Sequence, residues 1–300
     1  MKLSILLFSS IALLFSVAQA SKFWDDFYVN FGHWNVNYPG RDVGNIVQLQ
    51  LDDTSGSGFR SNFPYLYGQF SMRVKLAGGH SAGTVTSFYM ASVYEQWYEL
   101  DFEFLGNVTG EPYILQTNVF VEGDGYREQG IYLWFDPTAD YHDYGFVWNH
   151  ELILFTVDSR VIRVFHNAKD LGIPYFEYQP MYIYSSIWNG EEWATCGGTV
   201  KPDWTQQPFV ASYTAFNVSN ACSVQSLSGE QAMNSCYEKL HQSSYGQDPN
   251  LALSQKQIDD LRWIRKNYLI YDYCKTTVHE KIEGVKSEFK LAPECSRNWP

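Results

Sequence analysis

The pattern that most restricts the fold is a long series of short apolar segments separated by turn residues. From residue 23 to about residue 200, Gly, Pro, Asn and Asp interrupt these segments, and helical periodicity is absent. Residues 68–76 alternate strictly, which would place four apolar side chains on one face of a strand: Phe70, Met72, Val74 and Leu76. Many short strands without intervening helices favour an all-β fold of two antiparallel sheets, arranged as a sandwich or jelly roll.

The last hundred residues carry a different pattern. Ser254 and Gln257 have the form of a capping box. Apolar residues follow at the spacing of one helix face: Ile258, Leu261, Ile264 and Tyr268. Leu269–Cys274 is then typical of a strand. We therefore expect a β domain at residues 21–205 and a short extension at residues 206–300, with one helix and one strand, packed on the sandwich.

The first twenty residues have the features of a secretory signal peptide. Lys2 precedes a short apolar run, and Ala18-Gln19-Ala20 offers small residues where a signal peptidase recognises them. A membrane anchor is the alternative, but the run is short for a bilayer span and no stop-transfer pattern follows. We expect cleavage after Ala20 and a soluble, extracellular mature chain that has no contact with a membrane.

The charge balance argues against a nucleic-acid partner. The chain has 33 acidic residues against 21 Lys and Arg, which gives a net charge of −12, and it has no basic stripe. Binding to phosphate backbones needs clustered Lys and Arg. An uncharged ligand suits this balance better.

All five cysteines follow residue 195. In an oxidising compartment they predict disulfides with one thiol left over. Pairing of nearest neighbours gives Cys222–Cys236 and Cys274–Cys295, which would staple the extension and leave Cys196 free. The sequence permits other pairings as well.

The segment Glu99–Gly106 carries the clearest chemistry. Glu99, Asp101 and Glu103 alternate with apolar residues, so a strand would place the three acids on one face. A solvated outer face is one explanation, but three successive like charges repel, and an ordinary surface strand would mix in other polar residues. Calcium is another explanation, although one regular strand cannot easily supply the roughly 6–8 oxygen ligands of that ion.

Paired carboxylates also suit a retaining glycosidase, whose two carboxyls lie roughly 5–5.5 Å apart. The α-carbons of Glu99 and Glu103 would be about 13 Å apart on a strand, and side chains that lean toward each other narrow this gap. One ionised Glu would attack the anomeric carbon and the other would protonate the leaving oxygen. Asp101 would hydrogen-bond the nucleophile and help to keep the acid protonated.

Beyond this triplet, the mature chain resembles the plant xyloglucan endotransglucosylase/hydrolases of glycoside hydrolase family 16. The resemblance covers nearly the whole mature chain and rests on these segments: Ser55–Phe59, Ser81–Thr86, Asp101–Asn107, Leu115–Asn118, Arg127–Gln129, Trp134–Thr138, Tyr184–Asn189, Trp193–Thr195, Arg262–Trp263 and Asn267–Cys274. It implies a catalytic β-jelly roll with a concave cleft that acts on β-1,4-glucan backbones. We expect neither a metal nor a cofactor.

The resemblance also implies roles for individual residues. By position, Glu99 is the nucleophile, Glu103 the acid/base and Asp101 the assisting carboxylate. The residues expected to contact sugars are Gln116, Thr117, Asn118, Arg127, Glu128, Glu192, Trp193 and Gly197. Packing in the core is an equal alternative for Trp193, and a surface ion pair is an alternative for Arg127 with Glu128.

The implied reaction cleaves xyloglucan and transfers the new end to another xyloglucan chain. We expect a monomer that works in the plant cell wall or apoplast, with xyloglucan or a related β-glucan as donor and acceptor. Capture of the intermediate by water would make the protein a hydrolase, and loss of catalysis would leave a glucan-binding protein. Phe102 and the absence of a longer cleft loop favour transfer.

The chain departs from the resembled family at three places, one of which is the absence of the Arg that usually follows Cys274. That family usually has His-Asp before the nucleophile, where this chain has Trp97-Tyr98, and Cys196 stands where a polar or charged residue is common. Sequons for N-glycosylation occur at Asn107 and Asn217. The family typically carries a glycan at the position of Asn107, and we expect glycans at both sites.

Overall fold

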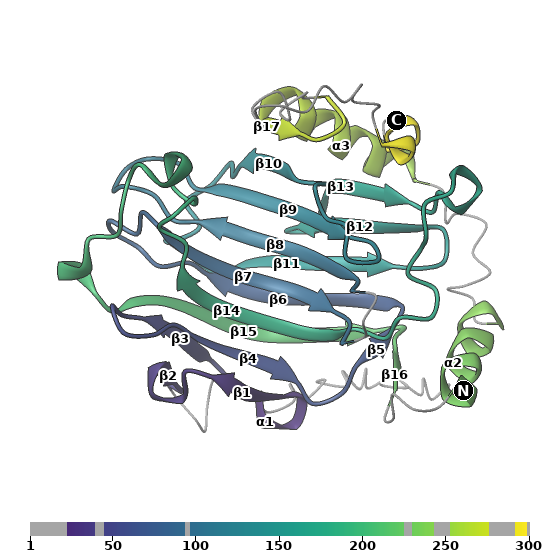
Figure 1. Ribbon diagram of the computed structural model, residues 1–300, viewed down its shortest axis with the longest axis horizontal. Coiled ribbons are helices and arrows are strands. Elements are labelled where there is room, and N and C mark those ends of the chain that lie inside the picture. Colours follow the sequence, from purple (N-terminus) through teal and green to yellow (C-terminus); the bar gives the residue numbers. More distant parts are fainter. Residues whose placement is uncertain are drawn as a thin grey trace, which may run out of the picture.

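The computed structural model describes residues 23–39, 45–93, 97–224, 230–242, 253–275 and 292–298 (Figure 1). The expected signal peptide at residues 1–20 lies outside these ranges. Within them, no helix combines the length and the apolar character needed to cross a membrane.

Two antiparallel sheets stacked on each other form the body of the molecule, as Figure 1 shows. The first sheet has eight strands in the spatial order β1 (Phe27–Phe31), β4 (Ser57–Ser61), β14 (Tyr182–Asn189), β7 (Thr84–Ala91), β8 (Glu99–Leu105), β9 (Ile114–Phe120), β10 (Gln129–Tyr132) and β17 (Leu269–Asp272). The second sheet has seven strands in the order β13 (Arg160–His166), β12 (Leu152–Val157), β11 (His142–Trp148), β6 (Gly68–Lys75), β15 (Phe209–Ser219), β3 (Val47–Leu51) and β2 (Val36–Asn37). A short pair, β5 (Tyr65–Leu66) with β16 (Cys222–Ser223), completes the strands of the described residues. The predicted all-β sandwich is thus confirmed.

Alternation along the strands builds the core between the two sheets. Phe102 of β8 packs against Phe146 of β11, with ring centroids 4.9 Å apart, and Phe104 packs against Tyr144 at 4.6 Å. These rings are almost fully buried. Because side chains on a strand point alternately to opposite faces, the residues between them must project away from the second sheet.

The helices of the described residues lie at the two ends of the chain. They are α1 (Phe23–Asp26), α2 (Glu230–Gln242) and α3 (Gln255–Asn267), with 3-10 turns at His33–Asn35, Lys169–Leu171, Cys196–Gly198, Trp204–Gln206 and Pro293–Ser296. The capping box at Ser254 and Gln257 is formed, and it begins α3 as predicted. The expectation of a single helix in the extension was wrong, because α2 is a second one.

The extension packs on the sandwich at two places. Leu261 of α3 joins a small apolar cluster on the outer face of the second sheet, made with Leu152, Leu154, Val161 and Val164. β17 then pairs with β10 and becomes the last strand of the first sheet. Figure 1 shows α3 and β17 together at this edge of the molecule.

The predicted boundary at residue 205 does not coincide with the end of the sandwich. β15 lies beyond that residue, yet it occupies a place inside the second sheet, between β6 and β3. The sheet therefore takes a central strand from the segment that the sequence pattern assigned to the extension.

Both expected disulfides form in the extension. Cys222 is bonded to Cys236, which ties β16 to α2, and Cys274 is bonded to Cys295, which ties the end of β17 to the last 3-10 turn. Cys196 is the free and exposed cysteine of the described residues.

Candidate active site

The three acids lie on one face of β8, as their alternation predicts. The residues that alternate with them point into the core: Leu100, Phe102 and Phe104. The acids therefore project from the outer face of the first sheet. Asp101 is only 6% exposed. A carboxyl on an ordinary solvated strand would remain open to water, so neighbouring side chains enclose this row.

Antiparallel register surrounds the row with polar side chains. On β9, Gln116 stands opposite Glu103, and Asn118 stands opposite Asp101. Gln116 Nε2 donates a hydrogen bond to Glu103 Oε2 at 3.3 Å. On the other side, Ser87 of β7 is the register partner of Glu103. The two strands that flank β8, β7 and β9, thus place neutral polar groups opposite Glu103 and Asp101 rather than further negative charges.

Glu99 receives hydrogen bonds from two side chains. Trp97 Nε1 donates to Glu99 Oε2 at 3.0 Å. Asp101 also bonds Glu99, and burial, followed by the charge of Glu99, raises the pKa of Asp101 well above its ordinary value. Of the two carboxyls, a protonated Asp101 would be the donor in this hydrogen bond. Burial raises the pKa of Glu99 as well, but both hydrogen bonds act in the opposite direction, because donors favour the charged carboxylate.

The surroundings of Glu103 favour its protonated form. Burial, then the charge of Glu99, raises the pKa of Glu103 to about 7. Glu128 adds a smaller contribution in the same direction, and the hydrogen bond from Gln116 opposes it. Two carboxyls whose environments differ in this way can divide the roles of ionised nucleophile and protonated acid between them.

The calcium hypothesis for the acid row receives no support from the arrangement. Within the described ranges, no group of three or more His, Cys, Asp or Glu side chains is placed to hold a metal ion. The polar neighbours of the acids include hydrogen-bond donors, Trp97 and Gln116, which suit carboxylates better than a cation.

A band of aromatic and cationic side chains, which sequence analysis missed, continues the row across the first sheet. Tyr89 of β7 is the register partner of Asp101, and its ring stacks on Tyr184 of β14 with centroids 4.9 Å apart. Arg60 of β4 stands opposite Tyr184, and its guanidinium lies 4.1 Å from the ring centroid of Tyr182. Only strand register brings these distant positions together, so no local motif could reveal them.

Asn118 connects the acid row to the turn between β9 and β10. Its Oδ1 accepts a hydrogen bond from the backbone N–H of Arg127 at 3.1 Å, and its Nδ2 donates to Glu128 Oε1 at 3.4 Å. Glu128 therefore lies beside the row, as expected of a residue on the same face. The hydrogen bond from the Arg127 backbone also fixes the position of this turn.

Thr117 requires a correction. It was expected among the sugar contacts, but it lies between Gln116 and Asn118 on the strand and points to the opposite face. Its hydroxyl is buried and accepts a hydrogen bond from Arg163 Nη1 at 2.9 Å. Residues at successive positions of a strand cannot share a face, so Thr117 serves the interior and not the outer surface.

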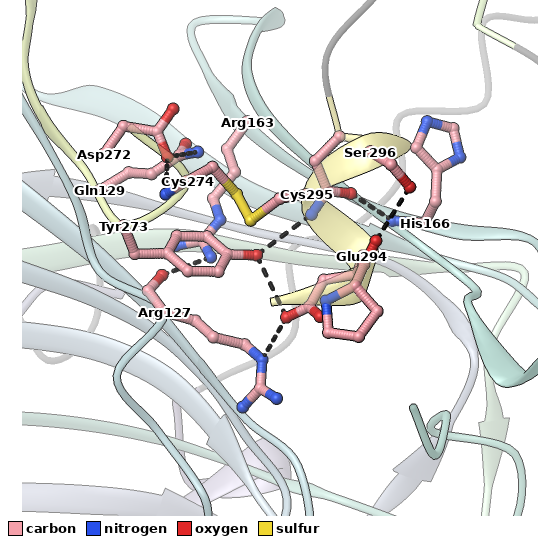
Figure 2. The surroundings of a disulfide bond; sticks show 12 residues. Arg127, Gln129, Arg163, His166, Asp272, Tyr273, Cys274, Glu294, Cys295 and Ser296 are labelled. Carbon is pink, nitrogen blue, oxygen red and sulfur yellow. Dashed lines mark hydrogen bonds and ion pairs between the residues drawn. A yellow bond between two sulfur atoms is a disulfide. The ribbon is translucent and has the colours of Figure 1, made fainter. Parts of the chain in front are cut away.

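Arg127 also differs from its expected environment. It was considered a sugar contact or a surface partner of Glu128, but its side chain is buried and pairs with Glu294, with Nε 2.7 Å from Oε1. Figure 2 shows this pair beside the Cys274–Cys295 disulfide, with Tyr273 also pointing toward Glu294. The Tyr273 hydroxyl donates to Glu294 Oε1 at 3.4 Å. Arg127 thus ties the turn beside the acid row to the end of the extension.

Matches to models of protein families show the family to which this chain belongs. A model of glycosyl hydrolases family 16 matches residues 23–206. These residues include every strand of the first sheet except β17, which pairs with β10. The chain belongs to glycosyl hydrolase family 16. A second model, described as the xyloglucan endo-transglycosylase C-terminus, matches residues 241–278.

Relatives within family 16 match along nearly the whole length. Xyloglucan endotransglucosylase protein 1 of Diospyros kaki is 45% identical over 291 residues, covering 96% of this chain and 93% of the relative. Putative xyloglucan endotransglucosylase/hydrolase protein 13 of Arabidopsis thaliana is 45% identical over 95% of this chain and 96% of its own. Among solved structures, a β-1,3-1,4-glucanase (lichenase) from a mouse hindgut metagenome is 25% identical, with a TM-score of 0.52 over 64% of this chain and 92% of that chain.

Three further predicted contacts of this family 16 chain share the loop after β14: Glu192, Trp193 and Gly197. Trp193 is 37% exposed, so it is not a core residue, and its ring lies against Trp188 with centroids 6.0 Å apart. Glu192 and Gly197 are exposed. The preceding Trp188 pairs with Val85, and Val85 pairs with Leu105, so the loop stands beyond the Glu103 end of the acid row.

The two sequons of the family 16 chain lie in different surroundings. Asn107 follows β8 closely, and its Nδ2 donates to the carbonyl of Pro112 at 2.9 Å. Asn217 is exposed on β15, on the second sheet. Glycosylation at both positions stays a prediction.

Proposed function

We propose that the protein is a secreted xyloglucan endotransglucosylase, which cleaves the β-1,4-glucan backbone of xyloglucan with retention and passes the new end to another xyloglucan chain. The observation that carries the proposal is the division of roles along β8. Glu99 receives two hydrogen bonds that favour its charged form, whereas burial holds the pKa of Glu103 at about 7. The names of the relatives support xyloglucan as the substrate class.

In the first step, a carboxylate oxygen of Glu99 forms a bond to the anomeric carbon on one side of the cleavage point. The bond from that carbon to the bridging oxygen breaks, and Glu103 gives its proton to this oxygen. The departing chain leaves with a free hydroxyl, and the donor chain remains as an ester of Glu99. Asp101 keeps its proton and donates to Glu99, which orients the attacking oxygen.

In the second step, Glu103, now ionised, takes a proton from an acceptor hydroxyl. The acceptor oxygen bonds to the anomeric carbon and the ester bond to Glu99 breaks, which restores both carboxyls. A sugar hydroxyl gives transfer, and water gives hydrolysis. A surface that orients a sugar beside the ester favours transfer, because orientation can outweigh the concentration of water.

The outer face of the first sheet offers such a surface. Four strand steps separate β1 from β8, which corresponds to about 19 Å of sheet at the usual strand spacing. Tyr182, Tyr184 and Tyr89 lie along this width and present rings, whose apolar faces suit sugar faces. On the other side of the row, Gln116 and Glu128 are the proposed hydrogen-bonding groups, and Trp193 is the proposed ring beyond Glu103.

One experiment separates transfer from its alternatives. The purified protein is mixed with xyloglucan, with and without a labelled xyloglucan oligosaccharide, and compared with the Glu99→Gln variant. Incorporation of label into polymer is the expected result. New reducing ends without incorporation would indicate a hydrolase, and retention of polymer without either would indicate a binding protein. Full activity of Glu99→Gln would overturn the assignment of the nucleophile.

We further propose that the chain is exported after cleavage behind Ala20 and acts as a monomer outside the cell. The two disulfides support an oxidising compartment. Mass spectrometry of the secreted protein measures both the new N-terminus and any glycans on Asn107 and Asn217. Sedimentation measures the state of association. An N-terminus at Met1 or a stable dimer would contradict this part of the proposal.

A further inference from the structure

We propose that Trp97 is a positioning residue for the nucleophile, in which the indole N–H holds the Glu99 carboxylate in the orientation that attacks the sugar. The inference rests on the proposed function, because it takes Glu99 to be the nucleophile. Trp97 is one of the two residues at which this chain departs from the His-Asp pair of the family that it resembles. The usual His-Asp pair has no indole at this position.

The hydrogen bond is direct and has good length. Trp97 Nε1 lies 3.0 Å from Glu99 Oε2. An indole N–H can only donate and has no proton to gain or lose in the physiological range, so it offers Glu99 the same contact at every working pH. Asp101 is the other side chain that hydrogen-bonds this carboxylate.

Three interactions hold Trp97 and the following residue, Tyr98, in place. The carbonyl of Trp97 accepts a hydrogen bond from the N–H of Gly123 at 2.7 Å. The next residue, Tyr98, is held by the hydroxyl of Ser92, which accepts from the Tyr98 N–H at 3.0 Å. The Tyr98 ring is buried and packs edge-on against Phe176 at 5.0 Å. Tyr98 therefore acts as an anchor that holds the indole beside the carboxylate.

The exposure of Trp97 separates a positioning role from a purely structural one. Its side chain is 47% exposed. A ring that served packing alone would be covered by the core, as Tyr98 is. Loss of the indole N–H should therefore change the behaviour of Glu99 much more than it changes the stability of the fold.

The charges that face Glu99 determine what loss of the donor would do. Asp101 and Glu103 lie on the same strand, and Tyr89 of the neighbouring β7 feels the charge of Glu99. On β9, the register partner of Glu99 is the uncharged Phe120. No cation is among these neighbours, so hydrogen bonds are what favour the charged form of Glu99, and Trp97 supplies one of them.

The test compares Trp97→Phe, which keeps a ring and removes the N–H, with Trp97→His, which restores a ring N–H. A matched control is Trp34→Phe, since Trp34 is 97% exposed and outside the site. For Trp97→Phe we expect the acidic limb of the kcat/KM profile to move up by about one pH unit, because a hydrogen bond to a charged group has about that effect on a pKa. We expect kcat to fall roughly tenfold with little change in KM, and Trp97→His to recover most of the loss.

An acidic limb and kcat of Trp97→Phe equal to those of the native protein would overturn the inference, as would a rise in KM alone, which would make the ring a binding surface. If Trp97→Phe unfolds, a second measurement decides: the NMR signal of the Trp97 indole N–H, followed with pH in the native protein. It should shift as Glu99 titrates and lose that shift in Glu99→Gln. An inactive Glu99→Gln together with an unshifted indole signal would refute the role of Trp97 alone, whereas an active Glu99→Gln would refute the proposed nucleophile.

Discussion

Gln116 and Glu103 face each other across two neighbouring strands, and Gln116 Nε2 donates to Glu103 Oε2 at 3.3 Å. The hydrogen bond from this amide lowers the pKa of Glu103, whereas burial and the charges of Glu99 and Glu128 raise it. It thus moderates the proton affinity of the group that we propose as the acid.

Replacing Gln116 by Leu should raise the pKa of Glu103, because the charged carboxylate loses a donor. The basic limb of the kcat/KM profile should then move to higher pH by about half a unit to one unit. The profile of initial rates against pH measures this. Gln116→Glu is the contrasting variant, since it adds a negative charge and should raise the limb further. A limb that moves down in Gln116→Leu would contradict the proposed role of the amide.

The native protein should show a bell-shaped dependence of kcat/KM on pH. In the proposed mechanism Glu103 carries its proton in the first step, so activity should fall as pH rises through its pKa, about 7. Glu99 must be ionised, so activity should also fall as the medium becomes acidic enough to protonate it. In Glu103→Gln the basic limb should disappear, with a loss of roughly 10²–10⁴-fold in rate. A basic limb that survives in this variant belongs to another group.

Trp193→Ala should weaken binding of polysaccharide without slowing the chemical step. The ring is exposed on a loop beyond Glu103, so it can touch sugars that do not react. An interaction made equally in the ground state and the transition state appears in KM rather than in kcat. Initial rates over a range of xyloglucan concentrations check this. A fall in kcat at unchanged KM would place Trp193 at the reacting sugar instead.

Glu294→Leu should destabilise the protein by about 3 kcal/mol, since Arg127 loses its buried charged partner and keeps only the exposed Asp124, 3.8 Å away. The free energy of unfolding in urea measures the effect. Asp259→Asn is the matched control, because its ion pair with Arg262 is exposed on α3 and should contribute little. Equal stability of Glu294→Leu and the native protein would show that the buried pair adds nothing.

Tyr98→Ala should cost roughly 3–5 kcal/mol of stability through loss of a buried aromatic ring. Tyr98→Phe should stay near the native value, because it keeps the packing on Phe176 and removes only the hydroxyl, which donates to Glu122 at 3.5 Å. Thermal unfolding compares the three proteins. A large loss in Tyr98→Phe would mean that the hydroxyl, rather than the ring, is the anchor.

Local patterns in the sequence predicted the elements that depend on local rules. The alternation of Glu99 to Glu103 gave the correct faces of β8, and the Ser254–Gln257 box gave the start of α3. Nearest-neighbour pairing of the cysteines was also confirmed. The second helix was missed, although Cys236, Tyr237 and Leu240 do recur at helical spacing and could have revealed it.

The features that could not be predicted from the sequence depend on contacts and register between distant parts of the chain. Roles transferred by position cannot tell on which side of a strand a residue stands, and Thr117 was misplaced for this reason. Arg127 found its partner in Glu294, a residue far along the chain for which no local pattern exists. The stacking of Tyr89 on Tyr184 likewise arises from the pairing of β7 with β14.

The position of β15 has a consequence for how the protein is made. β2 and β3, from the start of the chain, reach the rest of the second sheet only through this late strand. The ribosome must therefore release more than two thirds of the polypeptide before the early strands can find their places, and such long-range pairing folds slowly. A chain stopped at the end of the family 16 match would lack this bridge, so the enzyme cannot be divided there into two units that fold separately.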